Sequence, residues 1–128
     1  MDASLDQIEA IALETVARLP EAFRQAALSV IIRVEELPED TIVTEMGLAS
    51  PMELTGLYEG VPLTLKSAAE PDPYPDVVTL FRRPILSELE ERKTVTLEEL
   101  VTHVTIHEFA HHFGWSDEDI AKVDRWWE

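Results

Sequence analysis

Residues 96–117 read TLEELVTHVTIHEFAHHFGWSD, and this stretch determines more of the fold than any other part of the chain. Thr96 can cap the start of a helix, because its hydroxyl suits the first free backbone N–H groups and Glu99 follows three residues later. Gly114 can adopt a left-handed conformation and so end that helix. The sequence therefore predicts one long helix between Thr96 and Gly114.

Inside this predicted helix, the segment His107-Glu108-Phe109-Ala110-His111 places two imidazoles and a carboxylate close together. At about 100° per residue, His111 lies about 40° around the helix from His107 and roughly 6 Å along its axis, so both rings can bind one ion. Glu108 lies about 100° from His107 and about 60° from His111, at the edge of the same face. The spacing is typical of a zinc site with a carboxylate beside an activated water.

A third ligand for such an ion can come from Asp117, three residues after Gly114. Together with the two motif histidines it would supply two nitrogens and one oxygen and leave the fourth tetrahedral position open. The chain has no cysteine, so any metal site must use His, Asp or Glu. Asp117 also fits as an acidic residue in the first turn of a last helix that begins near Ser116. Both interpretations stay open at this stage.

The segment HEFAHHFGWSD resembles the HExxHxxGxxD signature of the aspartate-ligand zincins. Residues 56–64 (GLYEGVPLT) and 79–85 (TLFRRPI), together with the motif helix, resemble the small bacterial zincin-like, or mini-zincin, metallopeptidase family. The resemblance covers most of the chain after residue 50. It implies a compact zincin-like domain with zinc at the motif helix, and it supplies no natural substrate.

We therefore predict a zinc-dependent metallopeptidase with His107, His111 and Asp117 as ligands and Glu108 as the general base that activates a water. Larger metzincins place a methionine turn after the third ligand, whereas every methionine of this chain precedes the motif. The alternative function is a catalytically weak or inactive zincin-like module that acts in metal binding or protein interaction.

Four further side chains could belong to the site or have an ordinary structural role. His103, one turn before the first motif histidine, could face the same cavity or pack in the core. His112 lies off the ligand face and is interpreted as structural or as a support for the ligands. Arg82, with its neighbour Arg83, and Tyr58 could each stabilise an oxyanion. An exposed strand-end arginine and a half-buried packing tyrosine are their more ordinary roles.

The remaining sequence predicts an α+β fold in a single domain that spans residues 1–128. A small mixed sheet is expected from residues near 29–37, 54–65 and 77–81, where two extended runs in 54–64 favour a hairpin. This sheet should pack on the motif helix. Prolines at every second position predict an exposed loop over residues 67–76. Further helices are expected over residues 5–19, 20–27, 38–47, 84–92 and 116–127.

The net charge of the chain restricts the molecules that it can bind. The 128 residues contain 10 Lys and Arg against 26 Asp and Glu, a formal net charge of −16. This charge would repel phosphate backbones and anionic lipids, so we expect neither nucleic acid nor a membrane as partner. A peptide or protein substrate is expected, and a homodimer is compatible with the sequence. Since no segment has the features of a signal peptide or a spanning helix, we expect a cytoplasmic protein.

Overall fold

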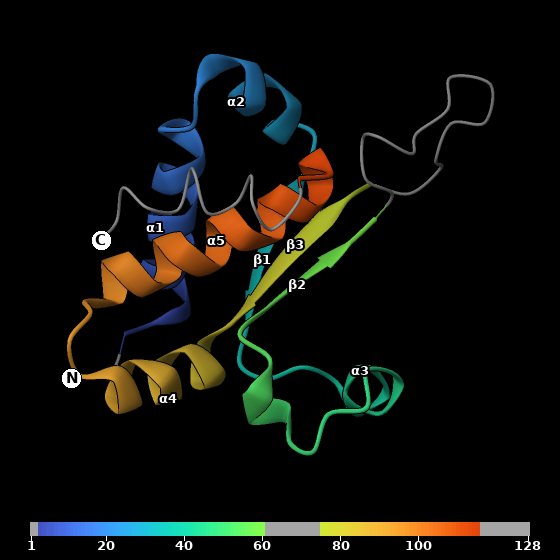
Figure 1. Cartoon of the computed structure of the whole chain (residues 1–128), viewed down its shortest axis with the longest axis vertical. Coiled ribbons are helices and arrows are strands. Elements are labelled where there is room, and N and C mark those ends of the chain that lie inside the picture. The colour runs from blue at the N-terminus through green and yellow to red at the C-terminus, as the bar shows by residue number, and fades with distance from the viewer. Residues whose placement is uncertain (1–2, 61–74, 116–128) are drawn as a thin grey trace.

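The computed structural model describes residues 3–60 and 75–115, which form an α+β fold (Figure 1). The helices are α1 (Leu5–Ala17), α2 (Glu21–Ala27), α3 (Asp40–Glu45), α4 (Arg82–Arg92) and α5 (Leu97–Phe113), with a 3-10 turn η1 (Pro51–Glu53). The strands are β1 (Ile31–Glu35), β2 (Gly56–Glu59) and β3 (Val77–Phe81). The predicted fold class is therefore confirmed.

The three strands form a mixed sheet in the order β1-β3-β2. Strand β3 lies in the middle, parallel to β1 with Ile31 opposite Val77 and antiparallel to β2 with Tyr58 opposite Val78. The middle position agrees with its burial: residues 78–81 are buried, and Thr79 is the one polar residue among the five of β3. Within the described residues, β1 and β2 each have one open edge.

Helices α1 and α5 pack side by side on one face of this sheet, α1 against β1 and α5 against β2 and β3. Val78 and Leu80 of the central strand are fully buried beneath them, as are Ile8 of α1 and Phe109 of α5. Side chains on most sides of α5 are buried, which places this helix in the middle of the hydrophobic core (Figure 1). The prediction that the motif helix packs on the sheet is confirmed.

The local signals that predicted the helices are present as hydrogen bonds. At the start of α5, the Thr96 hydroxyl accepts from the Glu99 N–H at 3.1 Å, and the Glu99 carboxylate accepts from the Thr96 N–H at 3.1 Å. Gly114 follows the helix with φ of 74°, in the left-handed conformation that a β-carbon would disfavour. Both ends of the site-bearing helix are thus specified by neighbouring residues.

Some predicted boundaries differ from the structure. Helix α4 begins at Arg82, so Pro84 occupies its third position and not its first. A proline is tolerated there because the first N–H groups of a helix have no partner within the helix. The second run of the predicted hairpin, most of the proline-rich loop and the predicted last helix lie outside the described residues. The first run is β2, which pairs with β3.

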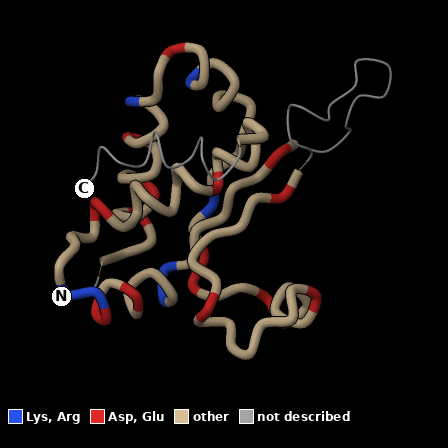
Figure 2. Tube along the Cα trace, viewed as in Figure 1, with Lys and Arg blue, Asp and Glu red and all other residues tan. Residues whose placement is uncertain are grey.

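Acidic residues are spread over the helices and strands of the described chain (Figure 2). This distribution is typical of an acidic surface that keeps a protein in solution. Among residues 3–60 and 75–115, no helix is long and apolar enough to cross a membrane.

Candidate metal centre

The two motif histidines lie one turn apart on α5, where His107 is half-buried and His111 is exposed. The ring of His103, one turn earlier, packs edge-on against His107 with 4.4 Å between ring centroids. The side of α5 that carries these rings is thus open to solvent at its C-terminal end and covered toward its middle. His103 belongs to the face of the motif, which was one of its two predicted roles.

Glu108 lies in a small pocket of about 160 Å³ beside His107. The pocket is bounded by the middle of α5, by the residue before β2 and by one side of α4. Its lining residues are Thr55, Glu88, Arg92, His103, Val104, His107 and Glu108. Glu88 and Arg92 form an ion pair with 2.9 Å between carboxylate oxygen and guanidinium nitrogen. The wall opposite the motif helix therefore carries one charge of each sign.

Burial raises the pKa of the Glu108 carboxyl from 4.5 to about 7, and a hydrogen bond from the Tyr58 backbone N–H acts in the opposite direction. Burial dominates because a carboxylate loses most of its hydration inside the fold, and this loss penalises the charged form. A carboxyl with a pKa near neutral can both accept and release a proton at physiological pH. This property suits a general base.

The raised pKa predicts a pH-dependent stability of the metal-free protein. Native Glu108 holds its proton up to about pH 7 and the unfolded residue up to about pH 4.5, so its contribution to folding stability falls between these values as pH rises. Glutamine does not titrate, so the variant does not lose this contribution. In chelator, the free energy of unfolding of Glu108→Gln relative to wild type should therefore be about 2 kcal/mol higher at pH 8 than at pH 5.5. Urea unfolding measures this difference, with Glu90→Gln at an exposed position as baseline. An equal effect of Glu108→Gln at both pH values would contradict the shift.

Within residues 3–60 and 75–115, no group of three His, Asp or Glu side chains is arranged to hold a metal ion. The predicted third ligand, Asp117, lies outside the described residues, so its role stays a prediction. The described donors suit zinc, because His107 and His111 are imidazoles one helical turn apart. A divalent cation beside them would also favour the ionised form of the buried Glu108 carboxylate.

His112 faces away from the motif histidines and is fully buried. Its Nδ1 lies 2.8 Å from the Asp76 carboxylate, and the Tyr58 hydroxyl lies 3.3 Å from the same nitrogen. The structure thus places His112 off the ligand face, as predicted, in a buried pair with Asp76. The end of the proline-rich segment was expected to be exposed, which is wrong for Asp76, whose residue surface is 4% exposed. Its pairing with His112 explains this burial.

The two arginines considered as oxyanion stabilisers do not line the pocket at Glu108. The Arg82 guanidinium bonds to the Glu36 carboxylate at 2.8 Å and to the Ala3 carbonyl oxygen at 2.6 Å. Arg82 and Arg83 both line a different pocket of about 340 Å³ between α4 and η1, near Met52. Arg82 is thus part of the contact that fastens the N-terminal segment and the end of β1 to α4.

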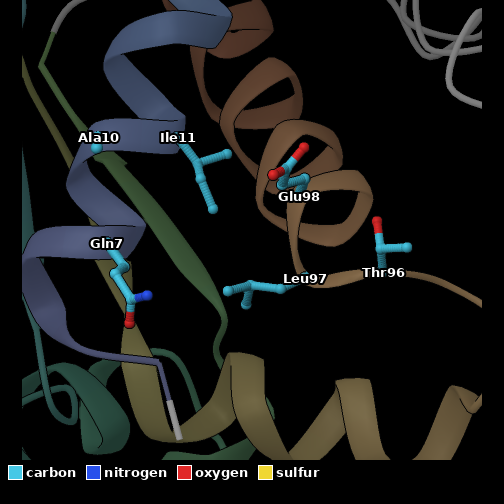
Figure 3. A pocket seen from close by; sticks show the side chains of 6 residues that line it. All are labelled: Gln7, Ala10, Ile11, Thr96, Leu97 and Glu98. Atoms are coloured by element: carbon cyan, nitrogen blue, oxygen red, sulfur yellow. The ribbon is translucent and has the colours of Figure 1, made fainter. Parts of the chain in front are cut away.

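A larger pocket of about 550 Å³ lies between α1 and the start of α5 (Figure 3). Its lining is mainly apolar, and Gln7, Thr96 and Glu98 are its polar side chains. Neither of the two predicted ligands within residues 3–60 and 75–115, His107 and His111, contributes to it. Pocket size alone therefore does not point to the predicted site residues.

The family model described as zincin-like metallopeptidase matches residues 27–127 of the chain. The matched region contains all three strands and α5, and with them every described residue of the candidate centre. Comparison with proteins that carry curated descriptions found no match.

Proposed function

Since the chain belongs to the zincin-like metallopeptidase family, we propose that it is a zinc-dependent peptidase. In this proposal His107, His111 and Asp117 hold the ion, and Glu108 is the general base. The observation that carries it is the position of Glu108, a buried carboxyl with a pKa of about 7, in a pocket next to a motif histidine. Burial of a carboxyl costs folding free energy, and a role as general base accounts for a carboxyl kept at this position.

Zinc, when bound, supplies Lewis acidity that acidifies a water and polarises the carbonyl of the peptide. The carboxylate of Glu108 takes a proton from the attacking water and then passes it to the nitrogen of the leaving amine. Both transfers need the same oxygen atoms to face the pocket. The imidazoles of His107 and His111 contribute nitrogen donors and must be unprotonated to bind.

The pocket beside Glu108 also limits the substrate. Its volume of about 160 Å³ is close to that of one side chain, so we expect the enzyme to bind short or exposed peptide segments. The net charge of −16 should favour basic peptides over acidic ones through long-range attraction. Large folded proteins should resist cleavage.

The direct test is to incubate the zinc-loaded chain with a mixed peptide library and read new termini by mass spectrometry. Cleavage that disappears after chelation and returns with zinc supports the proposal. If the zinc-loaded chain cleaves no peptide under conditions where it binds zinc, the peptidase function fails. A zincin-like module that acts in metal binding or protein interaction then takes its place.

The role of Asp117 can be separated from that of a helix cap. If Asp117 is a ligand, Asp117→Ala should weaken zinc binding far more than Asp119→Ala, and its effect on thermal stability should vanish in chelator. Loss of a cap would instead cost about 1 kcal/mol of folding stability with or without metal. Zinc titration and thermal unfolding of both variants decide between them. A defect of the same size in chelator would reject the ligand role.

A further inference from the structure

A buried polar cluster joins β2 to the last turn of α5. The Tyr58 hydroxyl donates to the Asp76 carboxylate at 3.2 Å and lies 3.3 Å from Nδ1 of His112. On the other side of the His112 ring, Nε2 lies 3.4 Å from the Ala26 carbonyl oxygen. His112 is fully buried and Asp76 is nearly so. In such surroundings polar contacts are costly to break, because water cannot replace them.

This cluster fastens four separate segments at one point. Tyr58 lies on β2, Asp76 directly precedes β3, His112 lies on α5 and Ala26 lies on α2. The Tyr58 and His112 rings also contact each other, with 5.7 Å between their centroids. The cluster therefore fixes how the outer end of β2 lies relative to α5.

The backbone of Tyr58 connects the cluster to the candidate base. The Phe81 N–H donates to the Thr55 carbonyl at 2.9 Å, and in an antiparallel ladder the bonded pairs alternate. Leu57 is consequently bonded to β3, whereas the N–H of Tyr58 points away from β3, out of the open edge. That N–H donates to the Glu108 carboxylate.

Gly56 explains how β2 comes near enough for this bond. A β-carbon at Gly56 would lie 2.9 Å from Cγ of Glu108 and 2.8 Å from Cγ1 of Val104, both closer than normal contacts. The absence of a side chain lets the strand backbone rest directly on the Glu108 side chain. The Glu108 side chain thus lies along the edge of β2, next to residue 56 and with its carboxylate at the N–H of residue 58.

We propose that Tyr58 is a positioning residue for Glu108. Its backbone N–H holds the carboxylate, while its hydroxyl, fastened by Asp76 and His112, holds the strand segment that carries this N–H. The inference rests on the proposed function, because a fixed orientation matters only if Glu108 acts as a base. A carboxylate oriented before the substrate arrives needs no reorganisation during proton transfer.

The first test measures amide hydrogen exchange by NMR in the zinc-loaded, full-length protein. Glu108→Ala should raise the exchange rate of the residue 58 amide about tenfold, the usual effect of losing one hydrogen bond. Tyr58→Phe keeps the ring and the N–H. It should raise the same rate several-fold, because β2 loses its contact with α5 at residue 58 while it stays paired with β3. The Leu57 amide, which faces β3, is the internal control and should be unchanged in both variants. This measurement is independent of catalysis.

The second test separates positioning from simple loss of stability. Tyr58→Phe should lower kcat three- to tenfold, with KM and bound zinc unchanged. The matched control is Thr102→Val, which also deletes one partly buried hydroxyl, in the 3.2 Å bond between Thr15 and Thr102 that joins α1 to α5. That variant should lose stability while kcat and the residue 58 amide remain as in the wild type.

Two results would overturn the proposal. A residue 58 amide that exchanges equally fast in Glu108→Ala and wild type would show that the carboxylate is held elsewhere. Equal exchange in Tyr58→Phe and wild type would remove the role of the hydroxyl. A wild-type protein that hydrolyses no peptide would instead reject the proposed function, and the exchange rates would still report whether Tyr58 holds Glu108.

Discussion

Glu108→Gln is expected to lower peptide hydrolysis by a factor on the order of 100 or more while leaving zinc and the fold in place. Glutamine has nearly the same shape and can still accept a hydrogen bond from the Tyr58 N–H through its amide oxygen. It cannot accept the proton of the attacking water. Steady-state rates on a peptide that the wild type cleaves, compared at equal zinc content, give the result.

Two controls make this experiment specific. Zinc content, measured by elemental analysis, must stay near that of the wild type, because loss of metal would also abolish activity. Glu88→Gln removes a carboxylate from the opposite wall of the same pocket and should have a much smaller effect on kcat. A Glu108→Gln variant with full zinc and wild-type rate would remove Glu108 from the mechanism.

His107→Ala and His111→Ala are each expected to abolish stoichiometric zinc binding. Substitution of residues that merely support a ligand already weakens metal affinity by about 10- to 100-fold, so loss of a direct ligand should exceed this range. Isothermal titration of the metal-free variants with zinc measures the change. Glu108→Gln is the matched control, because it alters the residue between the two histidines and should keep the affinity. Zinc held normally by either alanine variant would contradict the assignment.

The part of the site that could be predicted from sequence is the part that depends on local spacing. The capping residues Thr96 and Glu99 and the terminal Gly114 lie within one or two turns of the backbone groups that they serve. Helical periodicity likewise places His107 and His111 on one face without knowledge of the rest of the chain. The motif helix, its ends and the fold class were therefore predicted correctly.

The surroundings of Glu108 depend on contacts between distant segments, and these were not predicted. Asp76 is one of 26 acidic residues, and nothing near it in sequence distinguishes the carboxylate that pairs with His112. A buried histidine on α5 signals that some partner is needed, but it does not identify that partner. Gly56 could equally have been a turn residue, since only the packing of β2 on α5 requires its small size.

The partners of the Arg82 side chain could likewise not be predicted from the sequence around it. Its position between a strand and a helix suggested an exposed side chain, and its two neighbours in sequence give no sign of an ion pair. The structure brings Glu36 from the segment after β1 and the Ala3 carbonyl from before α1 to its guanidinium. Both partners are far away in sequence, so periodicity carries no information about them.

The middle position of β3 has a consequence for the order in which the protein can fold. Both β1 and β2 pair with β3 alone within the described chain, and β3 follows both of them in sequence. A ribosome that has released only the first 60 residues has therefore exposed two strands that still lack their common neighbour. Closing the segment between residues 31 and 77 costs chain entropy before β1 and β3 can pair. This cost slows folding. We expect the nascent chain to stay vulnerable to association through these strand edges until residues 77–81 have emerged.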